Sequence, residues 1–168
     1  KLGQGLLGLL ADGESGQFTV SDSDGTRWAN VRLSGAPKFS PHPSGLEAEF
    51  QISFRAADPR KYGETQVFAG SAVDAHHCGN FPASPVVEVA GPRAAYTVTG
   101  PGGRTVQVTQ ALAAGQSHRI DFRTGHIYRN GVRQIGAMSR MQAWAVPPGK
   151  TTAMSISVGA MTVSVTDT

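Results

Sequence analysis

Residues 117–134 read Ser117-His-Arg-Ile-Asp-Phe-Arg-Thr-Gly-His-Ile-Tyr-Arg-Asn-Gly-Val-Arg-Gln134. Short β-forming runs are separated here by Thr124-Gly125 and then by Asn130-Gly131. Asn-Gly between β-formers is the strongest short-range hairpin signal, because a type I′ turn needs positive φ at both central residues. The pattern predicts a tight antiparallel meander, which is typical of a packed β scaffold rather than of a catalytic loop.

The composition of the 168-residue chain also favours an all-β protein. Hydrophobic residues make up 39% of the chain and charged residues 16%, while Gly (21) and Pro (10) are frequent. This mixture is too apolar for disorder and suits short strands joined by turns. The net charge of +3 comes from scattered basic residues, so we expect no nucleic-acid partner. The longest apolar run, residues 6–11, is too short for membrane insertion.

Residues 1–62 predict a short helix followed by strands. Leucines at positions 2, 6, 9 and 10 recur at helical spacing. A β-hairpin is expected next, with strands 17–20 and 27–33 around Asp22-Ser-Asp-Gly25, and then a Pro-rich link over 37–43. Residues 47–55 alternate with period two, so Phe50, Ile52 and Phe54 are expected on the buried face of one strand.

A domain boundary is expected at Ala57-Asp-Pro-Arg-Lys-Tyr-Gly63, because Pro59 cannot continue a central ladder. This boundary divides the chain into domains 1–62 and 63–168. Short strands separated by turns favour a β-sandwich of jelly-roll or galectin type for the second domain. Besides the meander, its predicted strands are 65–72, 85–90, 95–99, 104–110, 141–146, 154–158 and 161–165.

Several residue groups could carry chemistry, but a structural interpretation is favoured for each. Gly3-Gln-Gly5-Leu-Leu-Gly8 matches the G-x-G-x-x-G pattern of dinucleotide-binding proteins. That pattern indicates dinucleotide binding only when it follows a strand in a βαβ unit, and no such strand precedes it in this sequence. His76-His77-Cys78 lacks a further Cys/His pair at zinc-site spacing, although His118 and His126 could approach across the meander. Cys78 as a nucleophile would need an oxyanion site, and no carboxylate pair suggests glycoside hydrolysis. We therefore predict no enzyme activity, no cofactor and no metal site.

Three aromatic residues, Trp28, Tyr128 and Trp144, could contact a glycan or a protein partner. All lie in predicted strands, where core packing is favoured over an exposed platform. A carbohydrate-binding β-sandwich module is the alternative function, and it requires such rings on one exposed face with polar neighbours. Asp121 is expected to hold the strand end or the Thr124-Gly125 turn.

Four segments, taken in order, carry a family resemblance: Ala57-Asp-Pro-Arg-Lys-Tyr-Gly63, Gly79-Asn-Phe-Pro-Ala-Ser-Pro-Val-Val-Glu-Val-Ala-Gly-Pro92, Ile120-Asp-Phe-Arg-Thr-Gly-His-Ile-Tyr-Arg-Asn-Gly131 and Pro147-Pro-Gly-Lys-Thr151. They resemble segments of the distal tail proteins of long-tailed, siphophage-type bacteriophages, often labelled minor tail proteins. The resemblance extends over residues 50–168.

The resemblance implies a virion structural protein. Such proteins form a hexameric ring at the phage tail tip, between the tail tube protein and the tail hub protein, and can hold a receptor-binding protein or meet a host glycan. Residues 1–62 would be the second half of a belt, ring-forming domain, and residues 63–168 a galectin-like or carbohydrate-binding-module-like sandwich. The protein would be made in the host cytoplasm and reside in the virion. Because the family's first belt strands have no counterpart here and the chain begins with Lys1, we expect residue 1 not to start the gene product.

Overall fold

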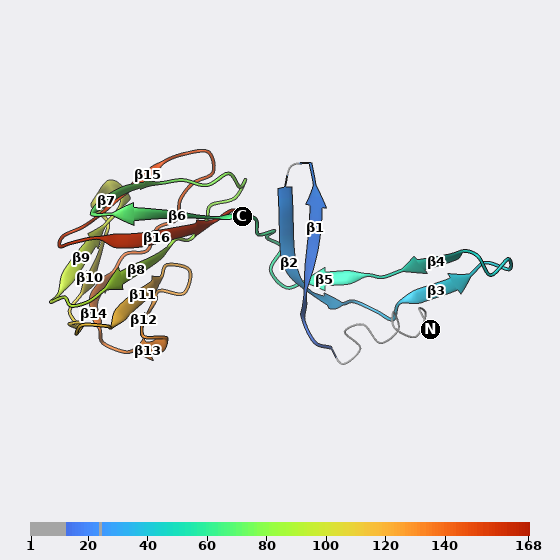
Figure 1. Cartoon of the computed structure of the whole chain (residues 1–168), viewed down its shortest axis with the longest axis horizontal. Helices are drawn as coiled ribbons and strands as arrows, with labels where there is room; N and C mark the ends of the chain where they lie inside the picture. The colour runs from blue at the N-terminus through green and yellow to red at the C-terminus, as the bar shows by residue number, and fades with distance from the viewer. Residues whose placement is uncertain (1–12, 24) are drawn as a thin grey trace. The chain divides into compact units, whose positions relative to one another are not determined.

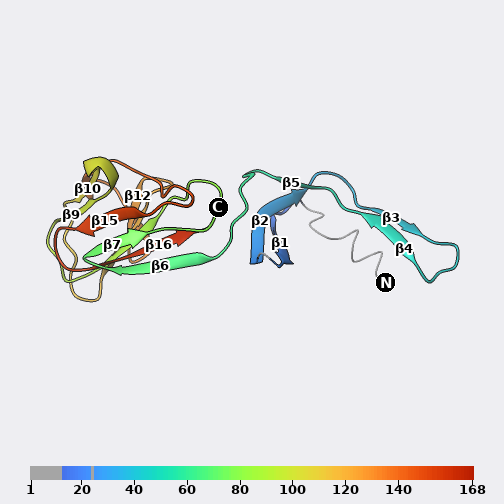
Figure 2. The ribbon, with the colours of Figure 1, turned by 90° about the horizontal axis from the view of Figure 1, so that it is seen from above.

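The computed structural model describes residues 13–23 and 25–168. The chain divides into two compact units, Lys1–Tyr62 and Gly63–Thr168, which we call the hairpin unit and the sandwich unit (Figures 1 and 2). The described residues are almost entirely β, with one short 3-10 turn, η1 (Pro101–Gly103), so the predicted all-β class is confirmed. The expected helix over 1–12 and the Gly3–Gly8 motif lie outside the described residues. Among the described residues, no helix is long and apolar enough to cross a membrane.

The hairpin unit contains a three-stranded antiparallel sheet in the order β1-β2-β5. Its strands are β1 (Gly16–Asp22), β2 (Gly25–Leu33) and β5 (Phe54–Ala56). Asp22 lies opposite Gly25 at the end of the ladder, which confirms the predicted hairpin. The end of the unit is held against β2, because Trp28 and Tyr62 exchange backbone hydrogen bonds of 2.8 and 2.7 Å.

A second, two-stranded sheet corrects two expectations for this unit. The supposed Pro-rich link contains β3 (Lys38–Pro41), which pairs with β4 (Ala48–Gln51). Pro41 is tolerated because β3 is an edge strand that needs only one ladder partner. The single strand expected over 47–55 is also wrong: it is interrupted at residues 52–53, where the chain leaves the β3-β4 sheet and joins β2 as β5.

The sandwich unit consists of a five-stranded and a six-stranded antiparallel sheet (Figure 1). The five-stranded sheet has the strand order β14-β10-β9-β15-β7. Its strands are β7 (Ala72–Ala75), β9 (Tyr96–Thr99), β10 (Thr105–Val108), β14 (Met138–Met141) and β15 (Thr152–Ile156). The six-stranded sheet has the strand order β13-β12-β11-β8-β16-β6. Its strands are β6 (Thr65–Gly70), β8 (Val86–Ala90), β11 (Ser117–Asp121), β12 (His126–Arg129), β13 (Val132–Gln134) and β16 (Met161–Thr166).

The core lies between these sheets and is built by the period-two alternation of their strands. Every second residue of a strand points inward, so β-branched side chains from both sheets meet there. Fully buried examples are Val87, Val98, Val106, Ile120, Ile127 and Val163.

The meander closes as the sequence predicts. Asn130 and Gly131 have φ angles of 48° and 81°, the positive values that a type I′ turn requires. At the preceding turn, Oδ1 of Asp121 accepts hydrogen bonds from the backbone N–H groups of Arg123 and Thr124 at 2.9 and 3.3 Å. Asp121 therefore has the turn-holding role expected of it.

The strand expected over 141–146 is wrong. The strand is β14, which ends at Met141, and residues 142–146 continue without a ladder to an isolated bridge between Val146 and Ala83. Trp144 and Val146 are both buried. The alternating apolar pattern therefore reflects a loop that faces the core. Gln142 in this loop accepts a hydrogen bond through its side-chain Oε1 from the backbone N–H of Thr105, at 3.0 Å.

A chain of polar side chains leads from the buried Tyr96 and His118 to the partly exposed Gln110 and Gln134. The hydroxyl of Tyr96 lies 3.0 Å from Nδ1 of His118, and Oε1 of Gln110 lies 3.0 Å from Nε2. Gln110 donates its amide hydrogen to Oε1 of Gln134 at 3.1 Å, so its own oxygen is the acceptor for His118. A neutral imidazole with its hydrogen on Nε2 therefore satisfies the whole chain, with Tyr96 donating to Nδ1.

Burial lowers the pKa of His118 from its ordinary value of 6.5, and the charge of Arg129 lowers it further. Burial likewise raises the pKa of the Tyr96 hydroxyl well above its usual range. Both shifts favour the neutral groups that the hydrogen-bond chain requires.

Acid should therefore destabilise the sandwich unit through His118. The unfolded chain gains a proton on this residue near pH 6.5, whereas the folded unit resists protonation until the pH is lower. The free energy of unfolding should thus be fully retained above about pH 6.5 and fall as the pH decreases below it. Denaturant titrations at about pH 7.5 and about pH 5.5 measure this difference.

His118→Gln should lower stability at the higher pH and reduce the difference between the two pH values. His42→Gln, in the exposed loop of the hairpin unit, is the control and should keep the wild-type difference. The same pH dependence in wild type and His118→Gln would contradict the assignment.

Candidate interaction surfaces

The three candidate aromatic residues lie in different environments. Trp144 is 4% exposed and packs in the sandwich core, where its ring centroid is 4.5 Å from that of Phe122. Its Nε1–H donates to Sδ of Met154 at 3.2 Å. The backbone of Gly100 lies so close that a Cβ there would be 2.5 Å from the indole ring. Trp144 is therefore a core residue of this fold.

Trp28 and Tyr128 are both partly exposed, but their contacts differ. Trp28 stacks on Tyr62 with ring centroids 4.8 Å apart, and the Tyr62 hydroxyl donates to Asp58 at 2.6 Å. Trp28 thus holds the segment that ends the hairpin unit. Tyr128 lies on the outer face of the six-stranded sheet, where its ring meets that of His126 edge-on at 6.4 Å. Of the three rings, Tyr128 is the one that lies on the outer face of the sandwich unit.

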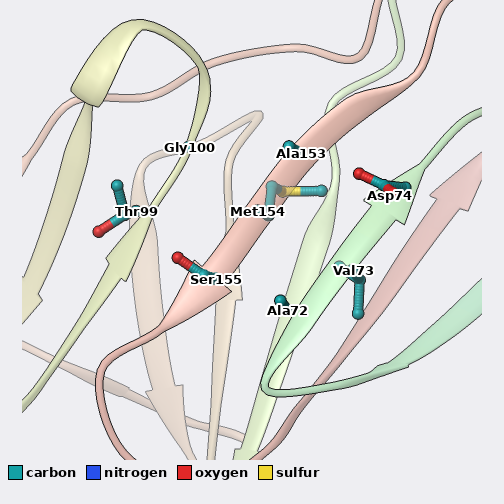
Figure 3. Close-up of a pocket in the computed structure, with 8 residues that line it drawn as sticks. All are labelled: Ala72, Val73, Asp74, Thr99, Gly100, Ala153, Met154 and Ser155. Atoms are coloured by element: carbon teal, nitrogen blue, oxygen red, sulfur yellow. The ribbon is translucent and has the colours of Figure 1, made fainter.

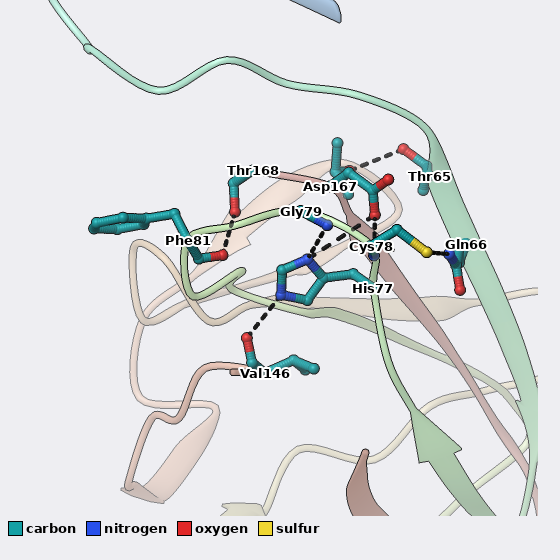
Figure 4. A network of polar contacts seen from close by, with 10 residues as sticks. Thr65, Gln66, His77, Cys78, Gly79, Phe81, Val146, Asp167 and Thr168 are labelled. Carbon is teal, nitrogen blue, oxygen red and sulfur yellow. Dashed lines mark hydrogen bonds and ion pairs between the residues drawn. The ribbon is translucent and has the colours of Figure 1, made fainter. Parts of the chain in front are cut away.

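The His76-His77-Cys78 segment belongs to a polar network beside the end of β16 (Figure 4). His77 is buried; its Nδ1 accepts from the N–H of Gly79 at 3.1 Å and its Nε2–H donates to the carbonyl of Val146 at 3.1 Å. Oδ1 of Asp167 accepts from the N–H of Cys78 at 2.9 Å. Residues 77–79 are therefore joined to Val146 and to Asp167, and the imidazole has no lone pair left for a metal.

The last residue of the chain packs into the same network (Figure 4). The backbone N–H of Phe81 donates to the carbonyl of Thr168 at 2.8 Å, and the Thr168 hydroxyl donates to the carbonyl of Phe81 at 2.9 Å. A Cβ on Gly79 would lie 2.2 Å from the Thr168 carbonyl oxygen, so only glycine allows this approach. The thiol of Cys78 is exposed and accepts a bond from the Gln66 amide at 3.6 Å. These contacts give the segment a structural role.

The other hypotheses of metal or acid–base chemistry gain no site in the described residues. His118 points into the core and lies opposite Arg129, whereas His126 lies opposite Asp121 on the outer face, so the meander does not bring the two rings together. Among the described residues, no group of three or more His, Cys, Asp or Glu side chains could hold a metal ion.

A shallow hollow of about 320 Å³ lies over β7, β15 and the end of β9 (Figure 3). Its lining mixes small, polar and apolar residues: Ala72, Val73, Asp74, Thr99, Gly100, Ala153, Met154 and Ser155. Asp74 contributes the one carboxylate of this lining, so the hollow offers no acid–base pair.

The described part of the hairpin unit exposes several large hydrophobic side chains while it buries very few. Among its described residues, Val31 is the single buried hydrophobic side chain. Phe50 is 63% exposed and Leu46 90% exposed, which corrects the expectation that Phe50 faces a buried side of its strand. Small sheets need a covered apolar face for independent stability. We call the exposed hydrophobic residues of this unit the hairpin apolar set: Phe18, Val20, Phe39, Leu46 and Phe50.

Neither a protein-family model nor a curated protein matches the sequence of this chain. Among solved structures, the fold is similar to the crystal structure of the SPP1 Dit (gp 19.1) protein, described as a paradigm of the hub adsorption apparatus in Gram-positive infecting phages. The TM-score is 0.72 with 15% sequence identity, over 90% of this chain and 64% of the Dit chain. The chain thus shares the Dit fold and spans less than two thirds of the Dit length.

Trp144→Ala should destabilise the sandwich unit by about 3–5 kcal/mol, because it leaves a cavity beside Phe122 and Met154. Trp144→Phe retains most of the packed surface and should cost less. Denaturation followed by circular dichroism measures both changes. Trp28→Ala is the control, since Trp28 packs within the hairpin unit and its loss should leave the sandwich transition in place. An unchanged transition in Trp144→Ala would contradict the packing described.

Proposed function

We propose that the chain is a structural component of a phage tail tip, where it forms a ring that joins the tail tube to the hub and receptor-binding apparatus. The observation that carries this proposal is the fold shared across 90% of the chain with SPP1 Dit, a protein of a hub adsorption apparatus. The sequence segments between Ala57 and Thr151 support the same assignment, because they follow the order seen in distal tail proteins.

In this proposal the hairpin unit is the second half of a belt domain and the sandwich unit is its galectin-like companion. Six copies form the ring, with the tail tube protein and the tail hub protein as neighbours and a receptor-binding protein as a further partner. The protein is made in the host cytoplasm and functions in the virion. This role requires assembly contacts and no catalysis.

The physical support comes from the hairpin apolar set. Phe39 and Phe50 lie opposite each other on the two-stranded sheet, and Phe18 packs on Phe54 with ring centroids 5.2 Å apart. Aromatic residues are enriched at the centres of protein interfaces, where they bury large areas. The strand β1 has β2 as its ladder partner, so its outer edge can accept a strand from a neighbouring chain. A ring would cover both features.

Native mass spectrometry and negative-stain imaging of the protein test the ring directly. We expect a six-membered species, and we expect Phe50→Asp to shift the population to smaller species, because a charge would then be desolvated in the interface. Ile135→Asp is the matched control: Ile135 is 93% exposed on the sandwich unit and should tolerate the charge without loss of assembly.

Circular dichroism of Phe50→Asp separates lost assembly from lost folding, since the sandwich signal should remain. A wild-type protein that stays monomeric both alone and with tail tube and hub proteins would overturn the proposal. Equal effects of the Phe50 and Ile135 variants would remove the hairpin apolar set from the interface.

A further inference from the structure

The outer face of the six-stranded sheet carries an ordered row of polar side chains. The strand register places Glu88, Arg119, Tyr128 and Arg133 side by side. They lie on β8, β11, β12 and β13, which are consecutive strands of the sheet (Figure 1). The residues on either side of Glu88 and Arg119 are buried, as is Ile127 beside Tyr128, so these three side chains point away from the core. Arg133 lies opposite Tyr128 in the ladder and therefore shares its face. We call them the outer row; it spans three strand spacings, about 14 Å.

The outer row places a guanidinium on each side of an aromatic ring. Nε of Arg119 lies 3.9 Å from Oε1 of Glu88, with both side chains about half exposed (48% and 55%). This contact orients Arg119 and leaves it further N–H donors, because a guanidinium carries five. Arg133 is exposed on the edge strand β13, where its cross-strand neighbour is Tyr128. The ring of Tyr128 thus lies between two cations in strand register.

A second row on the same face adds hydrogen-bonding groups. Ser164, Val86, Asp121 and His126 are neighbours in strand register across β16, β8, β11 and β12. All are partly exposed, and the His126 ring meets Tyr128. A hydroxyl, an imidazole and a carboxylate therefore accompany the flat ring, which suits a ligand rich in hydroxyl groups.

We propose that this face binds an anionic saccharide, with a sugar ring on Tyr128 and its carboxylate or phosphate between Arg119 and Arg133. The Tyr128 ring offers an apolar face and a polar edge. Guanidinium groups match carboxylate and phosphate with paired hydrogen bonds. A neutral sugar would leave both guanidiniums unused, and an acidic peptide would leave the polar second row unused. The site extends the tail-tip role but does not depend on it, because all of its residues lie within one sandwich unit.

Calorimetric and NMR titrations of the whole protein test the site with four probes. Oligogalacturonate supplies a carboxylate on a sugar, and phosphomannan oligosaccharide supplies a phosphate on a sugar. A neutral mannan oligosaccharide and polyglutamate separate the sugar contribution from the charge contribution. We expect saturable binding of at least one anionic saccharide, weakened by salt, because exposed charges are screened. Whichever of the two binds identifies the anionic group.

Tyr128→Ala and Arg133→Gln should each weaken binding by about tenfold, as expected for loss of a stacking surface or a charge-assisted pair. Arg140→Gln removes another exposed cation, from β14 of the other sheet, and should leave binding unchanged. Thermal unfolding verifies that each variant is folded. Phe50→Asp should assemble poorly yet bind the saccharide normally, which distinguishes this site from the ring.

Any of four outcomes would overturn the proposal. The first is no saturable binding of either anionic saccharide. The second is equal affinity for the neutral mannan, which would make the guanidiniums irrelevant. The third is equal affinity for polyglutamate, which would make the face a general anion surface. The fourth is an equal loss of binding in Arg133→Gln and Arg140→Gln, which would remove the outer row from the binding site.

Discussion

The packing of alternate strand residues between the two sheets is the constraint on which the sandwich unit depends. Ile120 and Ile127 point inward because they lie in register across β11 and β12, and Val87 joins them from β8. A slip of one residue would bury charged side chains such as Arg119 and expose the isoleucines. The register that closes the core therefore also sets the outer row: Glu88, Arg119 and Tyr128 are strand neighbours of these core residues, and Arg133 lies opposite Tyr128.

The described part of the hairpin unit shows no comparable packing constraint. Among its described residues only Val31 is buried, while Phe18 and Phe50 remain accessible. Hydrophobic burial is the main favourable term in folding, so a unit that buries little gains stability when a partner covers it. The two units thus differ in how much of their apolar surface they bury by themselves.

Sequence reasoning predicted the features that depend only on neighbouring residues, such as tight turns. Asn130-Gly131 specifies its own turn geometry, and the Asp22 to Gly25 hairpin does the same. It missed β3 because Pro41 lowers the expectation of a strand, and an edge strand escapes that penalty. It joined β4 to β5 because alternation continues through residues 52–53, and periodicity carries no information about which sheet a residue joins.

The candidate site shows the same limit. Tyr128 follows the inward Ile127, so its outward direction is available from alternation alone, and His118 shares the inward side of Ile120 in the same way. The alignment of Glu88 with Arg119 joins segments far apart in the sequence and needs the folded register.

Inside the core every polar group must be paired, as Tyr96, His118 and Gln110 are, because an unpaired buried group costs free energy. On the outer face water satisfies each group, so Arg119, Tyr128 and Arg133 are not dictated by stability. Packing therefore accounts for the interior chain and leaves the outer row unexplained. A shared fold does not determine surface chemistry, so the outer row is the part of this face that the proposed saccharide site would explain.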